Sequence, residues 1–221
     1  MPRQARIVVA GELFHVTQRG NYKQKIFEDN IDRGHYLKLF EEYKNKHGLE
    51  VFAFCLMDNH VHWIVKPRQV ESLAQTICRC HQRYAYYRHK KRNVLGHLWQ
   101  ERFYSCLLQG EHIRQAIRYV ERNPVRAGMV DHPWDYGWSS ARAHLGKEYK
   151  VITLSDPSMY FGKIDWKDFI SQPEDEEHLK EIRNKTIKGT VLGAQEFITD
   201  LELSLGRDIL PKPRGRPRKG K

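Results

Sequence analysis

The chain lacks any apolar run long enough to cross a membrane. None of its hydrophobic stretches approaches the roughly 20 residues that a spanning helix needs. Its first residues, MPRQARIVVAGELFHV, also lack the apolar segment and small-residue cleavage site of a secretory signal. We therefore expect a soluble, intracellular protein with no membrane partner.

Cysteine is scarce, with four in 221 residues. Cys55 and Cys106 stand in apolar, strand-like runs and are expected in the core. The stretch CRCH (Cys78, Cys80, His81) suggests zinc only superficially, because it lies in a helical pattern and has no second ligand pair at zinc spacing. The cysteines therefore fit a reducing compartment, and they do not favour a zinc site.

Acidic residues are outnumbered, with 27 Asp and Glu against 38 Lys and Arg and a formal net charge of +11. This balance favours an anionic partner, with nucleic acid first and an acidic membrane surface second. The last eleven residues, PKPRGRPRKGK, carry six basic residues and no acidic one. Such a composition cannot pack a core, so residues 211–221 should be disordered when free.

The pattern of the chain predicts strands near residues 5–20, 49–57, 60–67 and 102–108, and helices near residues 28–48, 73–92 and 111–123. Asp29 or Asn30 can cap the first helix, Gly48 can end it, and Pro124 stops the third. The order β-α-β-β-α-β is the ferredoxin-like pattern. We therefore predict an α+β fold: an antiparallel sheet with helices on one face, which leaves the other face for a ligand.

After Gly146 the pattern weakens to one charged and one amphipathic helix. We therefore divide the chain into a first domain of residues 1–145, a mostly helical C-terminal extension of residues 146–210, and the basic tail of residues 211–221.

The stretch HVHWIVKP places His60 and His62 two residues apart on a predicted strand. Residues i and i+2 share a face, so the two imidazoles lie side by side and can converge on one divalent ion. Val61, Trp63 and Val65 then face the helices. The plainer alternative, two ordinary half-buried histidines on a solvated sheet face, stays open at this point.

The helix before Pro124 offers groups that two histidines lack. Tyr119 and Asn123 are four residues apart and share one edge of that helix. A tyrosine is a latent nucleophile that a metal or basic neighbour can activate, and an asparagine offers an oxygen ligand. Spacing alone equally allows Tyr119 to be an amphipathic boundary residue.

Several segments together resemble a known family. MDNHVHWIV is similar to the His-hydrophobe-His signature of HUH endonucleases. RYVERNPVRAGMV with WDYGWSSARAHLG resembles the tyrosine-helix segment of REP-associated tyrosine transposases, a branch of the single-tyrosine HUH transposases. VTQRGNYKQKIF and HLWQERFYSCLL resemble the first-strand turn and the fourth strand of that family. The resemblance covers about residues 5–145.

The resemblance implies metal-dependent cleavage and rejoining of single-stranded DNA beside hairpin-forming repeats, in the nucleoid of the bacterial cytoplasm. His60 and His62 would bind Mg²⁺ or Mn²⁺, and Tyr119 would be the nucleophile. Asn123 stands where relatives often carry Gln, so its place among the metal ligands is an expectation that this departure weakens. Residues of the matching segments and of the tail are candidates for DNA contacts: Arg19, Asn21, Arg102, Arg126, Arg214 and Arg216.

Two rival functions and one structural question stay open in the sequence. A non-catalytic RRM-like binder has the same β-α-β-β-α-β order and would stack bases on Phe52, Phe54 or Trp63. A replication-initiator or relaxase nuclease would use the same chemistry on another substrate. The protein is expected to be a monomer or a homodimer, because some relatives exchange tyrosine helices, whereas this long extension can cover that surface instead.

The tail contains Gly-Arg-Pro, Gly215 to Pro217, and resembles an AT-hook. An extended segment of this kind is narrow enough for the minor groove, where Arg is drawn to A·T-rich DNA. The alternative is a basic tail that adds only charge. On either interpretation the tail is expected to bind duplex DNA.

Overall fold

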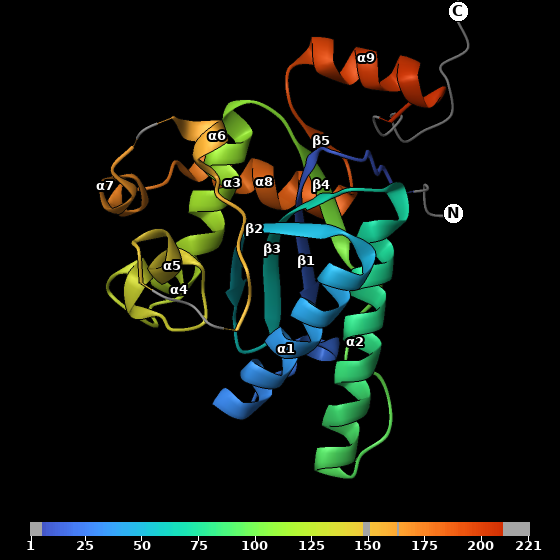
Figure 1. The fold of residues 1–221 in the computed structure, drawn as a ribbon, viewed down its shortest axis with the longest axis vertical. Helices are drawn as coiled ribbons and strands as arrows, with labels where there is room; N and C mark the ends of the chain where they lie inside the picture. The colour runs from blue at the N-terminus through green and yellow to red at the C-terminus, as the bar shows by residue number, and fades with distance from the viewer. Residues whose placement is uncertain (1–5, 148–150, 163, 210–221) are drawn as a thin grey trace, which may run out of the picture.

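The computed structural model describes residues 6–147, 151–162 and 164–209, and a five-stranded sheet lies at its centre (Figure 1). The strands follow the order β2-β3-β1-β4-β5. They are β1 (Leu13–Arg19), β2 (Leu49–Leu56), β3 (His60–Pro67), β4 (Tyr104–Leu108) and β5 (Val191–Leu192). The first four pair antiparallel, and β1 and β3 are the central strands. This arrangement confirms the predicted ferredoxin-like α+β fold.

Helices α1 (Asn30–His47) and α2 (Val70–Arg92) lie side by side on one face of the sheet (Figure 1). Val61, Trp63 and Val65 of β3 are buried beneath them, as the alternation predicts. The ring of Trp63 stacks on Phe40 of α1 with ring centroids 3.6 Å apart. Aromatic stacking and burial therefore fix the orientation of β3, and with it the face on which His60 and His62 lie.

The remaining helices follow β4 in the chain. They are α3 (Glu111–Glu121), α4 (Asn123–Arg126), α5 (Ala141–His144), α6 (Ser158–Phe161), α7 (Trp166–Ser171), α8 (Glu176–Lys188) and α9 (Gln195–Leu205). Of the 3-10 turns, η1 (Asn21–Lys23) follows β1 and η2 (Pro133–Asp135) follows α4. In the described residues, no helix is both long and apolar enough to span a membrane.

The local signals at the helix ends are mostly confirmed. Asp29 caps α1 by accepting a hydrogen bond from the Asp32 amide at 2.8 Å, and Gly48 ends the helix in the left-handed region at φ 68°. The predicted role of Pro124 as the residue that stops the third helix is different in the structure: α3 ends at Glu121, and Pro124 lies in the first turn of α4. A proline is tolerated there because the first turn of a helix needs no N–H donor at that position, and proline has none.

The second face of the sheet is covered more fully than the sequence predicts. Helix α3 buries Ile113, Ala116, Ile117 and Val120 in an apolar cluster with Ile64 of β3. Helix α8 contacts β4 and lies behind the strands in Figure 1. Helices therefore cover both faces of the sheet, and the expected ligand face is left only around His60 and His62. The division of the chain at residue 145 stays a prediction, although β5 of the extension pairs with β4.

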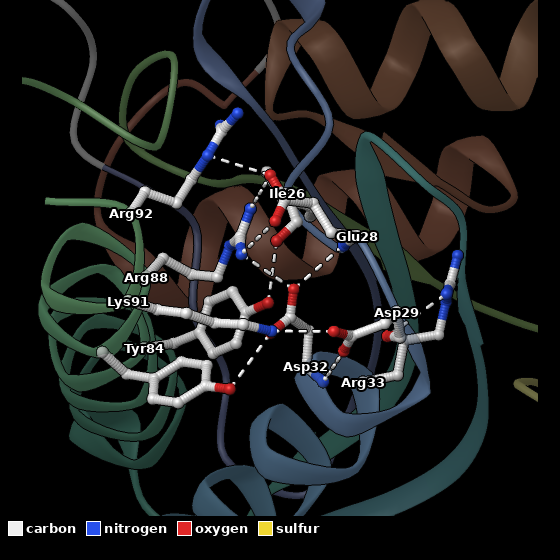
Figure 2. Close-up of polar contacts among 10 residues, drawn as sticks. Ile26, Glu28, Asp29, Asp32, Arg33, Tyr84, Arg88, Lys91 and Arg92 are labelled. Carbon is white, nitrogen blue, oxygen red and sulfur yellow. Dashed lines mark hydrogen bonds and ion pairs between the residues drawn. The ribbon is translucent and has the colours of Figure 1, made fainter. Parts of the chain in front are cut away.

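A network of charges joins the start of α1 to the end of α2, as Figure 2 shows. Asp32, which is fully buried, pairs with Arg88 at 2.8 Å and with Lys91 at 2.7 Å. The next residue, Arg33, pairs with Asp58 in the turn before β3. The network therefore fixes two helix ends, and its neighbour Arg33 holds the turn from which His60 begins.

Candidate functional site

A pocket of about 490 Å³ opens on the second sheet face, between the central strands, the end of α3 and helix α8. Its walls include four residues that the sequence predicts: His60, His62, Tyr119 and Asn123. Tyr119 is only 5% exposed, and it borders this pocket at the end of α3. Residues from β3, α3 and α4 that are far apart in the chain therefore meet at one place.

His60 and His62 lie side by side on β3, with ring centroids 4.9 Å apart. The Nδ1 atom of His60 is 2.6 Å from the side-chain oxygen of Asn59. The Nδ1 atom of His62 is 2.8 Å from Nε2 of His15, a buried residue of β1. Because both Nδ1 atoms take part in hydrogen bonds, Nε2 is the atom that each ring offers to the pocket.

The electrostatics of the pocket keep these imidazoles neutral. Burial lowers the pKa of His60 to about 4, and the charges of Arg19 and Arg126 add to the effect. Burial also holds the pKa of His62 well below its usual value, with further contributions from the neighbouring histidines and arginines. A neutral imidazole is the form that binds a metal ion, so the pocket suits that role.

Tyr119 sits against the histidines. Its ring meets the rings of His15 and His62 edge-on, with centroids 5.5 Å apart in each case. The Asn123 amide nitrogen donates to the Tyr119 carbonyl at 3.3 Å, so the amide oxygen of Asn123 is its remaining polar atom. Arg122 between the two helices keeps helical dihedral angles, which is why Asn123 still follows Tyr119 by one turn.

Two of the predicted DNA-contact residues border this site. Arg19 lies at the end of β1 opposite His60 and lines the pocket. The guanidinium of Arg126 lies 4.3 Å from the centre of the Tyr119 ring and donates to the Tyr119 carbonyl at 2.7 Å. It also pairs with Glu174 of the extension at 2.5 Å. The charge of Arg126 is thus paired with Glu174, and the arginines that line the pocket and give it a positive rim are Arg19 and Arg183.

The other predicted DNA contacts lie elsewhere. Asn21 belongs to the turn η1 after β1, and Arg102, two residues before β4, lines two other pockets. The structure does not bring either residue into the histidine pocket. Arg214 and Arg216 fall outside the described residues, as does the whole AT-hook-like tail.

Sequence reasoning missed several polar residues of the pocket, and His15 and Thr186 are two of them. His15 had a readable signal, because alternation along LFHVTQR places it with Thr17 on one face, and the predicted fold sets that strand beside His62. Thr186 had none. It belongs to α8 in the extension, and no local pattern shows where that helix docks.

A buried carboxylate, Glu121 of the segment RYVERNPV, connects this segment to WSSARAH in the fold. Glu121 has no exposed surface and accepts hydrogen bonds from Ser140 at 2.6 Å, from His144 at 2.6 Å and from Trp166 at 3.0 Å. Ser140 in turn bonds the Phe54 backbone of β2. The residue two positions after Tyr119 is therefore anchored to the sheet and to the extension.

The donor set of the pocket fits a divalent ion that accepts both nitrogen and oxygen. Two neutral imidazoles and one amide oxygen are available, and phosphate or water oxygens can complete such a shell. In the described part of the chain, no group of three or more His, Cys, Asp and Glu side chains is arranged to hold a metal. A site here therefore depends on Asn123 and on the substrate for its oxygen ligands.

The comparison with protein families decides the relationship of the chain. A family described as "Transposase IS200 like" matches residues 9–123. The chain belongs to this IS200-like transposase family. The matched segment contains His60, His62, Tyr119 and Asn123, so all four candidate residues lie in the part that defines the family.

The chain is also similar to solved structures. A REP-associated tyrosine transposase bound to a REP hairpin shares 17% identity and a TM-score of 0.58, covering 75% of this chain and 100% of that chain. This likeness shows a common fold. A putative transposase from Deinococcus radiodurans R1 shares 19% identity over 55% of this chain and 97% of that chain, with a TM-score of 0.36. No curated protein matches the sequence.

Proposed function

We propose that this IS200-like transposase belongs to the REP-associated branch and is a metal-dependent endonuclease and strand transferase. It cuts single-stranded DNA beside hairpin-forming repeats. The observation that carries the proposal is the meeting of Tyr119, His60, His62 and Asn123 in one pocket with a positive rim. A solved relative in fold that is bound to a REP hairpin supports this class of substrate.

The chemistry follows from the side chains. His60 and His62 would hold Mg²⁺ or Mn²⁺ through Nε2, with Asn123 as an oxygen ligand. A bound ion of this kind polarises a phosphate and offsets the charge that grows in the transition state. Arg19, which lines the pocket, would hold the phosphate backbone there, which aligns the scissile bond for in-line attack.

Tyr119 is the nucleophile of the proposed reaction. Its oxygen attacks the phosphorus and releases its proton, while the bond from phosphorus to the 3′ oxygen breaks. That oxygen takes up a proton, so the products are a 5′-phosphotyrosine and a free 3′-OH. A second 3′-OH can reverse the step and rejoin DNA without ATP, because the covalent ester conserves the phosphodiester bond.

Covalent trapping tests the nucleophile. The parent protein, incubated with Mn²⁺ and a labelled single strand beside a hairpin, should yield a protein–DNA adduct on a denaturing gel. Tyr119→Phe removes one oxygen atom and should abolish the adduct while DNA binding survives. Tyr86→Phe is the matched control, since Tyr86 is 66% exposed on α2. An adduct with the Tyr119 variant would show that another residue attacks.

Ligand removal tests the metal. His60→Ala and His62→Ala should each remove most cleavage, and EDTA should abolish cleavage by the parent. Non-specific DNA binding should persist in each case, because Lys and Arg supply it. Cleavage at the full rate in excess EDTA would contradict the assignment of the pocket to a metal.

The rival functions fare differently. An RRM-like binder needs exposed sheet aromatics, yet Phe52, Phe54 and Trp63 are at most 1% exposed. This burial disfavours a base-stacking platform on those residues. A replication-initiator or relaxase nuclease shares the chemistry, and cleavage assays on hairpin repeats against origin-like single strands separate it from the proposed substrate.

A further inference from the structure

One polar chain in the pocket reaches beyond the proposed metal ligands and ends in the C-terminal extension. Thr186 Oγ1 of α8 lies 2.8 Å from His15 Nδ1, and His15 Nε2 lies 2.8 Å from His62 Nδ1. Thr186 and His15 are each 1% exposed, and His62 is 5% exposed. The rings of His15 and His62 are nearly parallel, at 8°, which suits a hydrogen bond between ring nitrogens.

The direction of the hydrogen bonds follows from what a metal ligand must offer. To bind an ion through Nε2, His62 needs a lone pair there, so its proton resides on Nδ1. That N–H donates to Nε2 of His15. His15 must then carry its own proton on Nδ1, and it donates to the hydroxyl oxygen of Thr186.

Hydrogen bonds in the opposite direction would prevent His62 from binding a metal ion. A hydroxyl can donate as well as accept, so Thr186 could give its proton to His15 Nδ1. His15 would then donate to His62, and His62 would point an N–H into the pocket instead of a lone pair. The chain of three residues therefore has one arrangement that permits metal binding and one that prevents it.

We propose that Thr186 and His15 are positioning residues that fix His62 in its metal-binding tautomer, and that the extension is in this way a working part of the site. The inference rests on the proposed function, since it takes His62 as a ligand. It assigns a role to α8 beyond packing. Residues that orient a metal ligand typically change metal affinity 10–100-fold when they are removed.

The first experiment measures binding of Mn²⁺ alone to the full-length protein, without DNA. Thr186→Val and His15→Phe should each weaken binding by about 10–100-fold, and Thr186→Ser should restore it. Thr190→Val is the matched control, because Thr190 is also buried but its hydroxyl donates only to the Lys185 carbonyl. Parent-like affinity of the Thr186→Val protein would overturn the proposal.

The second experiment needs no variant of the hydrogen-bonded chain Thr186–His15–His62, which we call the relay. Ring-nitrogen NMR of the metal-free parent protein should show His15 and His62 both protonated on Nδ1. A proton on Nε2 of His62 would overturn the proposal even if the variants failed to fold. His62→Ala separates the two hypotheses: if that variant binds Mn²⁺ as the parent does, the metal site itself is wrong, whereas if only the relay variants bind normally, the relay alone is wrong.

Discussion

Replacing Asp32 with alanine should strongly destabilise the fold, because the substitution leaves a buried arginine short of a partner. The Asp32 carboxylate has no exposed surface, and the Arg88 side chain that pairs with it is 1% exposed. Lys91, 32% exposed, can turn to water or keep its bond to Asp29. The buried Arg88 cannot turn to water, and the acidic partner that it retains is Glu28, at 3.0 Å (Figure 2).

Breaking a buried ion pair by removing one partner typically costs about 3–5 kcal/mol. Because Glu28 still pairs with Arg88, we expect the lower end, about 3 kcal/mol, for Asp32→Ala. Loss of the acceptor for the Glu28 amide, at 2.9 Å, adds about 1 kcal/mol. Urea denaturation at neutral pH measures the sum.

The control is Glu42→Ala, which also removes a carboxylate from α1 but at an exposed position. Its cost should stay within about 0.5 kcal/mol. A loss below 1 kcal/mol for Asp32→Ala would refute the reasoning, since Arg88 would then have reached water or another acceptor.

The ion pair of Asp32 and Arg88 also predicts that the stability of the fold depends on pH. Burial alone would raise the pKa of Asp32, but hydrogen bonds from Lys91 and the Glu28 amide, with the charge of Arg88, lower it overall. A carboxylate with a lowered pKa stabilises the fold above its unfolded value, and the contribution is lost as the pH falls through the folded value. The difference between parent and Asp32→Ala should therefore shrink below about pH 4. A constant difference down to pH 2 would contradict the lowered pKa.

Four further predictions concern the tyrosine helix, the tail and the assembly. Glu121→Gln should cost about 2 kcal/mol in urea denaturation and slow adduct formation, because its buried donors lose a charged acceptor; unchanged stability would contradict the anchoring role. Deleting residues 211–221 should weaken duplex binding and reduce its salt slope by at most about 5, leaving cleavage of a short single strand intact. Arg214→Lys with Arg216→Lys should abolish A·T preference in duplex-binding titrations if the tail is a hook, and parent-like preference would identify a simple charge patch. Light scattering should give a monomer mass, since Arg122 of the α3–α4 junction donates to the Ile170 carbonyl of its own extension at 2.8 Å; a dimer would contradict this.

The sheet and its two long helices were readable from sequence because local patterns decide them. Alternation along HVHWIVKP places Trp63 under α1 and His62 on the opposite face, and the structure has both arrangements. The Asp29 cap and the Gly48 stop act within one helical turn. Tyr119 and Asn123 were placed together for the same reason, although a helix end falls between them.

Features that depend on how distant helices and strands pack against the sheet could not be predicted from the sequence. The prediction of an open second face failed because α3 and α8 pack there through apolar side chains that look alike in any amphipathic helix. The short strand β5 pairs parallel to β4 through two residues, too few for a pattern. Glu121 stood in a quoted motif, yet its partner Trp166 is 45 residues away.

These two kinds of feature meet in the pocket. In the proposed reaction the reacting groups come from β3 and α3, and local patterns set their mutual spacing. The extension supplies Thr186 behind His15 and Glu174 beside Arg126, which are contacts that constrain groups already present. In such a site, one part of the chain carries the reacting side chains and another part holds them in position. Substitutions at Thr186 should therefore be felt first in metal affinity, whereas substitutions at Tyr119 should be felt only in the covalent step.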